Sequence, residues 1–186
     1  MHFAHLIQTP FSSSTGWDEL RSRRPSVVSL VMFIVLPMSL IPPVMLYYAG
    51  THYGDAFIPG FGDKAWQFIT TIFFLAELLS FAVMGWLIHE VAGTHHPEIS
   101  LHDTYLLAAL APIPLWLSAL GLLIPSLAVN MLIALAALAA SCLLVYHGLQ
   151  GLKLIREDVE AMSVTYTIMA ASVIAWAMLL SIIWAF

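Results

Sequence analysis

One acidic residue, Glu77, interrupts the longest apolar stretch of the middle of the chain. The run from 65 to 91 contains no Lys or Arg that could pair with it, and its helical neighbours include Phe73, Phe81 and Met84. An unpaired carboxylate in an apolar medium is costly, so we expect Glu77 to be buried among helices and protonated at neutral pH. Such a carboxylic acid can donate a hydrogen bond.

Three interpretations of Glu77 stay open. The acid could donate to a backbone carbonyl left free by a helix proline, Pro37 or Pro112, since proline removes one helical hydrogen bond. It could serve a path for protons or ions. It could also recognise a lipid or another ligand.

A second group of residues combines imidazole and carboxylate side chains, which suit divalent transition metals. The group consists of His89, Glu90, His95, His96, His102 and His147. A His-Glu-x-x-His metalloprotease motif would need a histidine at Gly93, so the spacing argues against that enzyme class. A polar loop, a weak metal site and a sensor of cytoplasmic pH remain as interpretations, with no metal assigned.

The elements that position these residues follow from composition. The chain has 186 residues, of which 61% are hydrophobic and 9% charged, whereas soluble domains carry about 25% charged residues. Five apolar runs each hold roughly the 20 residues that cross a bilayer core. We predict spans at about 26–48, 65–91, 104–124, 129–149 and 161–184. Backbone groups in lipid must pair within each segment, so the predicted fold class is all-α, a polytopic bundle of five transmembrane helices.

The rest of the chain connects and flanks these spans. Residues 1–25 form a lead-in with a helix that would lie at the interface, and 26–186 form the membrane domain. Gly and Pro mark 50–63 as a turn-rich loop, and Asp103 or Thr104 is expected to cap the third span. The tryptophans near span ends, which include Trp66 and Trp116, are expected to anchor at the interface.

The basic residues indicate an orientation. Five of the six precede span one or lie between spans four and five, and these are Arg21, Arg23, Arg24, Lys153 and Arg156. Lys64 alone lies on the opposite side. The positive-inside rule then predicts a cytoplasmic N-terminus, a periplasmic C-terminus and a cytoplasmic histidine-rich loop.

Several short runs, in this order and spacing, resemble the Yip (Ypt-interacting protein) family, and more narrowly its small bacterial inner-membrane branch. They are Pro10 followed by Trp17, then His102-Asp103-Thr104-Tyr105, Ala108-Ala109, Pro112-Ile113-Pro114-Leu115-Trp116 and Tyr146-His147-Gly148-Leu149. The resemblance implies a five-helix bundle with a cytoplasmic N-terminus. Eukaryotic members bind small GTPases and shape secretory membranes, but their long cytosolic N-terminal region is absent here, so we do not expect that activity.

We therefore predict a non-enzymatic integral protein of the bacterial inner membrane. It would act in membrane organisation or as a partner-binding membrane subunit, without a cofactor. Its expected partner is the lipid bilayer, with a second copy or another membrane protein left open. No basic run suggests nucleic acid. The alternative is a small transporter or channel for protons or metal ions that uses Glu77 and the histidine-rich loop.

Overall fold

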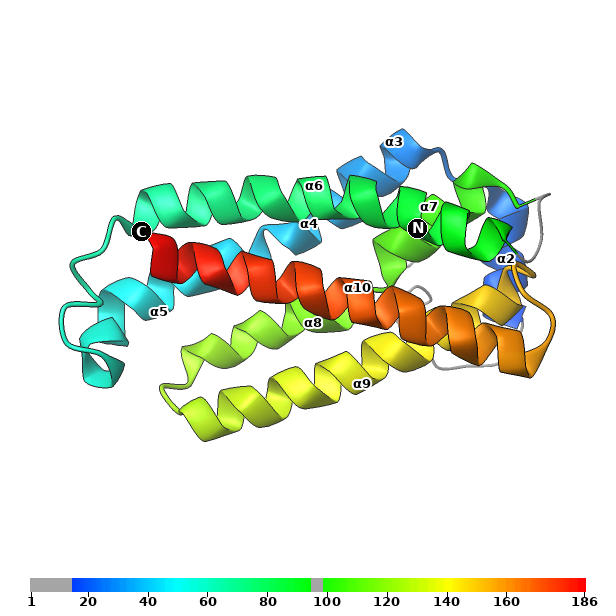
Figure 1. Ribbon diagram of the computed structural model, residues 1–186. Helices are drawn as coiled ribbons and strands as arrows, with labels where there is room; N and C mark the ends of the chain where they lie inside the picture. The colour runs from blue at the N-terminus through cyan, green and yellow to red at the C-terminus, as the bar shows by residue number, and fades with distance from the viewer. Residues whose placement is uncertain (1–14, 95–98) are drawn as a thin grey trace.

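The computed structural model describes residues 15–94 and 99–186, and within these ranges the chain is all-α. Five helical segments are long and apolar enough to cross a membrane: Val27–Phe57, Trp66–Gly93, Leu101–Leu123, Leu127–Gly151 and Asp158–Ala185. They lie lengthwise beside one another (Figure 1). The predicted fold class, a bundle of five transmembrane helices, is confirmed.

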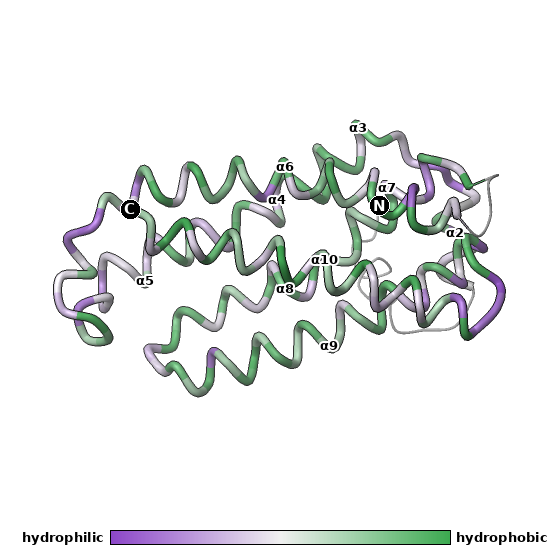
Figure 2. Tube along the Cα trace, viewed as in Figure 1, coloured by the Kyte–Doolittle hydropathy of each residue, from purple (hydrophilic) through white to green (hydrophobic). Residues whose placement is uncertain are grey.

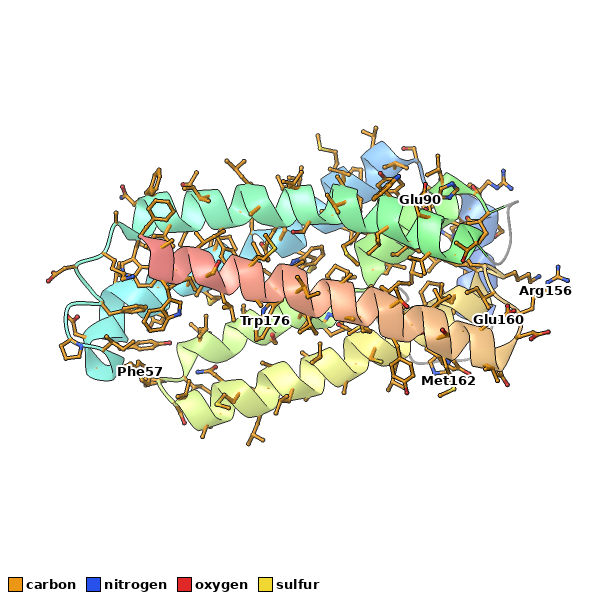
Figure 3. All side chains as sticks on the ribbon, in the orientation of Figure 1. Phe57, Glu90, Arg156, Glu160, Met162 and Trp176 are labelled. Atoms are coloured by element: carbon orange, nitrogen blue, oxygen red, sulfur yellow. The ribbon has the colours of Figure 1, made fainter. Side chains whose placement is uncertain are left out.

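The bundle has two ends that differ in what they carry. One end, called the α2 end below, holds the short helix α2 (Thr15–Arg23) and the connection from α9 (Leu127–Gly151) to α10 (Asp158–Ala185). The opposite end, called the far end, holds residues 58–65 and the end of α10. Hydrophilic residues gather at both ends, while the lengths between them are largely hydrophobic (Figure 2). Figure 3 shows Arg156 and Glu160 at the α2 end and Phe57 at the far end.

The first segment is built from several pieces because of its prolines. It comprises α3 (Val27–Leu30), a π-helical turn (Val31–Val35), α4 (Leu36–Ser39) and α5 (Ile41–Phe57). Within the π-helical turn the Leu36 N–H bonds to the Val31 carbonyl, five residues back, immediately before Pro37. Widened turns of this kind accommodate local interruptions of a helix.

Helix α5 ends at Phe57, nine residues beyond the expected end of span one at Tyr48. The glycines there permit close approach of aromatic rings and do not form a turn. A Cβ atom at Gly50 would overlap the Trp66 ring, and one at Gly54 would lie 3.4 Å from the Phe61 ring. The Trp66 indole also donates to the Phe61 carbonyl at 2.9 Å. The helix therefore continues through both glycines, and the turn begins after Phe57.

The third segment breaks where its prolines predict. Helix α7 (Leu101–Leu110) ends before Pro112, α8 (Ile113–Ser118) follows, and a 3₁₀ turn (Ala119–Leu123) completes the segment. The prediction that Asp103 or Thr104 caps this segment is wrong. Ser100 is the residue that precedes α7, and Asp103 lies within its first turn. The Thr104 hydroxyl donates to the Leu101 carbonyl at 2.9 Å.

Lys64 stabilises the far end through the end of α10. Its ammonium group donates to the Ile183 carbonyl at 2.6 Å and lies 4.9 Å from the centre of the Phe61 ring. A cation at a helix C-terminus satisfies carbonyls that have no helical partner and opposes the negative end of the helix dipole. This contact joins the connection after α5 to the end of the chain.

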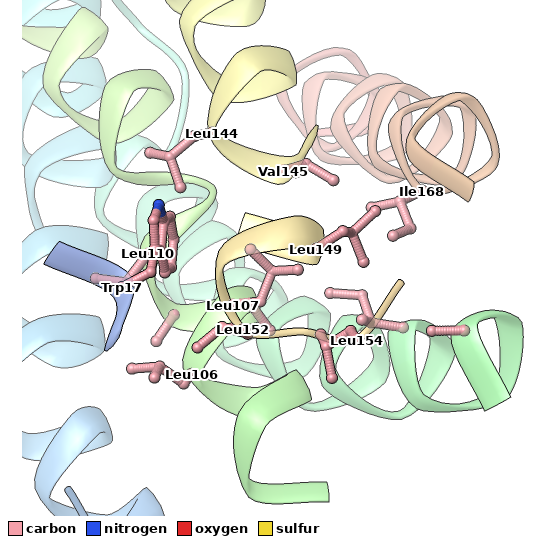
Figure 4. Packing of buried hydrophobic residues seen from close by; sticks show 14 of the residues in the cluster. Trp17, Leu106, Leu107, Leu110, Leu144, Val145, Leu149, Leu152, Leu154 and Ile168 are labelled. Carbon is pink, nitrogen blue, oxygen red and sulfur yellow. The ribbon is translucent and has the colours of Figure 1, made fainter. Parts of the chain in front are cut away.

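The largest apolar core lies toward the α2 end (Figure 4). Trp17 on α2 is 1% exposed and packs with leucines of α7 and α9. The ring lies against two glycines of α9: a Cβ at Gly151 would come 2.5 Å from Trp17 Cγ, and one at Gly148 would come 3.1 Å from Trp17 Cη2. Trp17 therefore faces the bundle, and α2 covers this end of it.

The contact between Trp17 and Gly151 gives the first testable prediction. Gly151→Ala should lower the free energy of unfolding by about 1–3 kcal/mol, because the added methyl group displaces a closely packed ring. Thermal unfolding in detergent, followed by circular dichroism, measures the loss. Gly93→Ala is the matched control, since a Cβ there meets no atom of the described residues within 4 Å.

A double-mutant cycle tests the cause of that loss. In a Trp17→Ala background the ring is gone, so Gly151→Ala should cost nothing further. An equal loss in both backgrounds would show that the glycine is needed for another reason.

Candidate functional site

Glu77 lies in α6 (Trp66–Gly93), the helix that packs against both α7 and α10. Its side chain is 8% exposed, so it points into the bundle. The Trp116 indole of α8 lies close to the Glu77 carboxyl. The second carboxyl oxygen, Oε2, is buried and has no hydrogen-bond partner among the described residues.

Trp116 is a partner that sequence reasoning missed. We expected an interface anchor, but the structure buries Trp116 to 5% exposure beside Glu77, and Trp66 is also buried. Counting residues could have found the pair. Glu77 lies sixteen residues before the end of α6 at Gly93, and Trp116 lies fifteen residues after the start of α7 at Leu101. Antiparallel helices therefore bring both to a similar depth.

Glu77 lines a partly open cavity of about 410 Å³ between the helices, called the Glu77 cavity below. Residues from α5 to α10 contribute to its wall, and most are apolar. Aromatic rings come from Phe73, Phe81, Trp116 and Trp176. The volume lies within the range of about 300–1,000 Å³ that is typical of ligand pockets.

Most polar groups of the cavity already have partners in their own helix or turn. The hydroxyls of Ser80, Ser118 and Ser172 donate to the carbonyls of Ala76, Leu115 and Ile168 at 2.6–2.8 Å. The Asn130 amide donates to Ile124 and Ser126, both at 2.9 Å. By contrast the Ser141 hydroxyl of α9, on a residue 2% exposed, has no partner within the described chain.

The cavity reaches the side of the bundle between α9 and α10. Three of its lining residues are also exposed large hydrophobic residues: Leu127, Met131 and Trp176. Trp176 is labelled on α10 in Figure 3. In a membrane this flank faces hydrocarbon, so an apolar chain could enter from the bilayer.

The histidine-rich group is only partly described. His95 and His96 lie outside the described residues. His102 bonds the Pro25 carbonyl at 2.5 Å and Asp103 at 3.3 Å, while Glu90 and His147 are exposed. Within 15–94 and 99–186, no group of three His, Cys, Asp or Glu side chains could hold a metal ion. His89 is half-buried, and its Nδ1 lacks a partner among the same residues.

A comparison with known protein families identifies the family of this chain. The family model for the Yip1 domain matches residues 7–184. The chain belongs to the Yip1 domain family. The resemblance drawn from its short sequence runs is thereby confirmed at the level of the family. No curated protein and no solved structure matches the chain.

The structure does not favour a transporter for this Yip1 domain protein. The described part of the chain contributes one titratable side chain, Glu77, to the cavity wall, and the hydroxyls of the wall mostly bond within their own helices. A path for ions needs successive polar groups from facing helices. The lining is instead suited to hydrocarbon.

The Glu77–Trp116 pair gives the second prediction. Glu77→Leu should cost about 1–3 kcal/mol of stability, because the buried indole N–H of Trp116 loses the polar group beside it. Glu77→Gln retains a carbonyl that can accept and should unfold at a temperature close to that of the wild type. Thermal unfolding in detergent is the measurement.

Ser80→Ala is the control, since that hydroxyl bonds only within α6. In a Trp116→Phe background, Glu77→Leu should cost less, because the N–H has already been removed. Equal stability of Glu77→Leu and wild type would contradict the prediction. Infrared spectroscopy at pH 7 should show a carboxylic acid band that Glu77→Gln lacks.

Proposed function

We propose that this Yip1 domain protein is a non-enzymatic protein of the bacterial inner membrane that organises the surrounding bilayer by holding a lipid chain in the Glu77 cavity. The observation that carries the proposal is the cavity itself, which is apolar, lies between membrane-spanning helices and reaches the flank between α9 and α10. Hydrocarbon is the solvent on that flank, so a lipid chain is the molecule most available to fill the Glu77 cavity.

The side chains around the cavity support binding more than catalysis. Acyl transfer needs a nucleophile beside a base, and metal-assisted hydrolysis needs several ligands. The cavity combines one carboxyl group with hydroxyls of which all but that of Ser141 bond to backbone carbonyls of the described chain. Such a wall can hold a molecule in place by apolar contact and a few hydrogen bonds.

A cavity-filling variant tests the function. Ala134 on α9 lines the cavity, whereas Ala136 is exposed two residues away on the same helix. Native mass spectrometry of protein extracted in mild detergent should show bound lipid for the wild type and for Ala136→Phe. We expect Ala134→Phe to lose most of it, because the phenyl ring occupies the space of the chain. Equal retention by all three proteins would refute a lipid role for the cavity.

The orientation proposed here places the α2 end in the cytoplasm. Arg23, Arg24, Lys153 and Arg156 belong to that end, and Lys64 belongs to the far end. The excess of basic residues supports this orientation through the positive-inside rule.

A reporter fused after Phe186 measures this topology in bacterial cells. We expect alkaline phosphatase, which needs the periplasm, to be active there, and a cytoplasm-dependent reporter at the same position to be inactive. The same reporters fused within the connection between α9 and α10, after Arg156, should give the opposite result. A cytoplasmic C-terminus would overturn the orientation.

A further inference from the structure

We propose that the Glu77 cavity selects a neutral lipid whose small head group carries a hydroxyl or carbonyl oxygen, and that Glu77 and Ser141 are the residues that hydrogen-bond it. This inference rests on the proposed lipid-holding function and adds the class of ligand. It depends on the depth of the site, its charge, its unpaired polar atoms and its length.

The depth of Glu77 excludes a head group that must stay at the membrane surface. Glu77 lies eleven residues from Trp66 and sixteen from Gly93, which places it about 16 Å and about 24 Å from the two ends of α6. A polar group that bonds Glu77 therefore sits well inside the hydrocarbon region. Only a small and neutral head group can be brought there at modest cost.

The charge of the cavity lining favours the same class of ligand, a neutral lipid. Among the described residues, the cavity lining contains no Lys, Arg or His, and Glu77 is the one titratable residue there. A phosphate or carboxylate brought beside Glu77 would find no cation to offset its desolvation. A hydroxyl or carbonyl needs only a hydrogen bond.

The unpaired atoms supply those hydrogen bonds. The Trp116 indole lies close to the Glu77 carboxyl, and the Oε2 atom of that carboxyl is buried without a partner in the described chain. The Ser141 hydroxyl of α9 is also buried and unpaired among the described residues, and it lines the same cavity nearer the α2 end, ten residues before Gly151. Buried polar groups of native proteins nearly always have partners, so two orphans in one cavity point to a ligand that satisfies them.

The remaining length of the cavity fits a chain. On α6 its lining extends from Phe73 to Ile88, which is about 22 Å along the helix axis. Ile88, Val145 and Ile168 close it toward the α2 end, where they join the tightly packed core. A lipid held at Glu77 can therefore place a hydrocarbon chain along apolar residues in this direction.

A matched pair of lipids tests the inference. Dioctanoylglycerol and dioctanoyl phosphatidic acid carry the same chains and differ by one phosphate group. Binding to purified, delipidated protein is measured by native mass spectrometry across a titration of each lipid. For the wild type we expect one dioctanoylglycerol per chain and an affinity at least about tenfold weaker for the phosphatidic acid, because the phosphate charge is unpaired in the cavity.

Substitutions then identify the hydrogen-bonding residues. Ser141→Ala and Glu77→Leu should each weaken dioctanoylglycerol binding roughly 3- to 10-fold, which is the effect of one lost hydrogen bond. Glu77→Gln keeps polar atoms at the site and should bind within about threefold of the wild type. Cys142→Ala, next to Ser141 on the same helix, is the control and should bind like the wild type. Ser141→Ala is a small change, so the test stands even if Glu77→Leu fails to fold.

The outcomes separate this inference from the proposed function. If both lipids bind equally and Ala134→Phe abolishes both, the lipid-holding function stands and the selection of a neutral head group is wrong. If dioctanoylglycerol is preferred but neither Ser141→Ala nor Glu77→Leu weakens it, the assignment of the two residues is wrong. If the wild type binds neither lipid and retains none on extraction, both proposals fall.

Discussion

The packing of Trp17 against two glycines of α9 is the close fit that organises the α2 end of the bundle. Helices in lipid gain little from burying apolar side chains, because the solvent is itself apolar, so close fit and small residues decide where they meet. Gly148 and Gly151 provide that fit at the α2 end, and the ring lies where their side chains would be. Leucines of α7 and α9 then close around it, as Figure 4 shows.

The closely packed α2 end helps the bundle to tolerate the Glu77 cavity in its middle. Large cavities in proteins are costly because the atoms that line them lose contacts. Here α8 and α9 pack on each other and α10 packs on α6, while the Glu77 cavity lies among them. The core near Trp17 and the contact of Lys64 with the end of α10 hold the helices at both ends. The cavity between them can be filled from the bilayer.

Sequence reasoning succeeded where the physical requirement is local. The break at Pro112 follows from a missing N–H group, and the apolar runs are long because a bilayer is thick. It failed where one residue type has two uses. Gly50 was taken as a sign of a turn, but it permits the approach of Trp66 within a continuous helix. Trp116 was taken as an interface anchor because it lies near a span end, and only the packed bundle shows that it is buried in the interior beside Glu77.

The amino-acid sequence by itself determined the number of spans, the family and the presence of a lone acid at membrane depth. Each of these depends on residues close together in the chain or on the order of short runs. The tertiary structure decided which side of each helix faces inward, because spans that are apolar on all sides carry no periodic signal that separates lipid from protein. The pairing of Glu77 with Trp116, the orphaned Ser141 and the cavity that joins them therefore became visible only when the helices were packed.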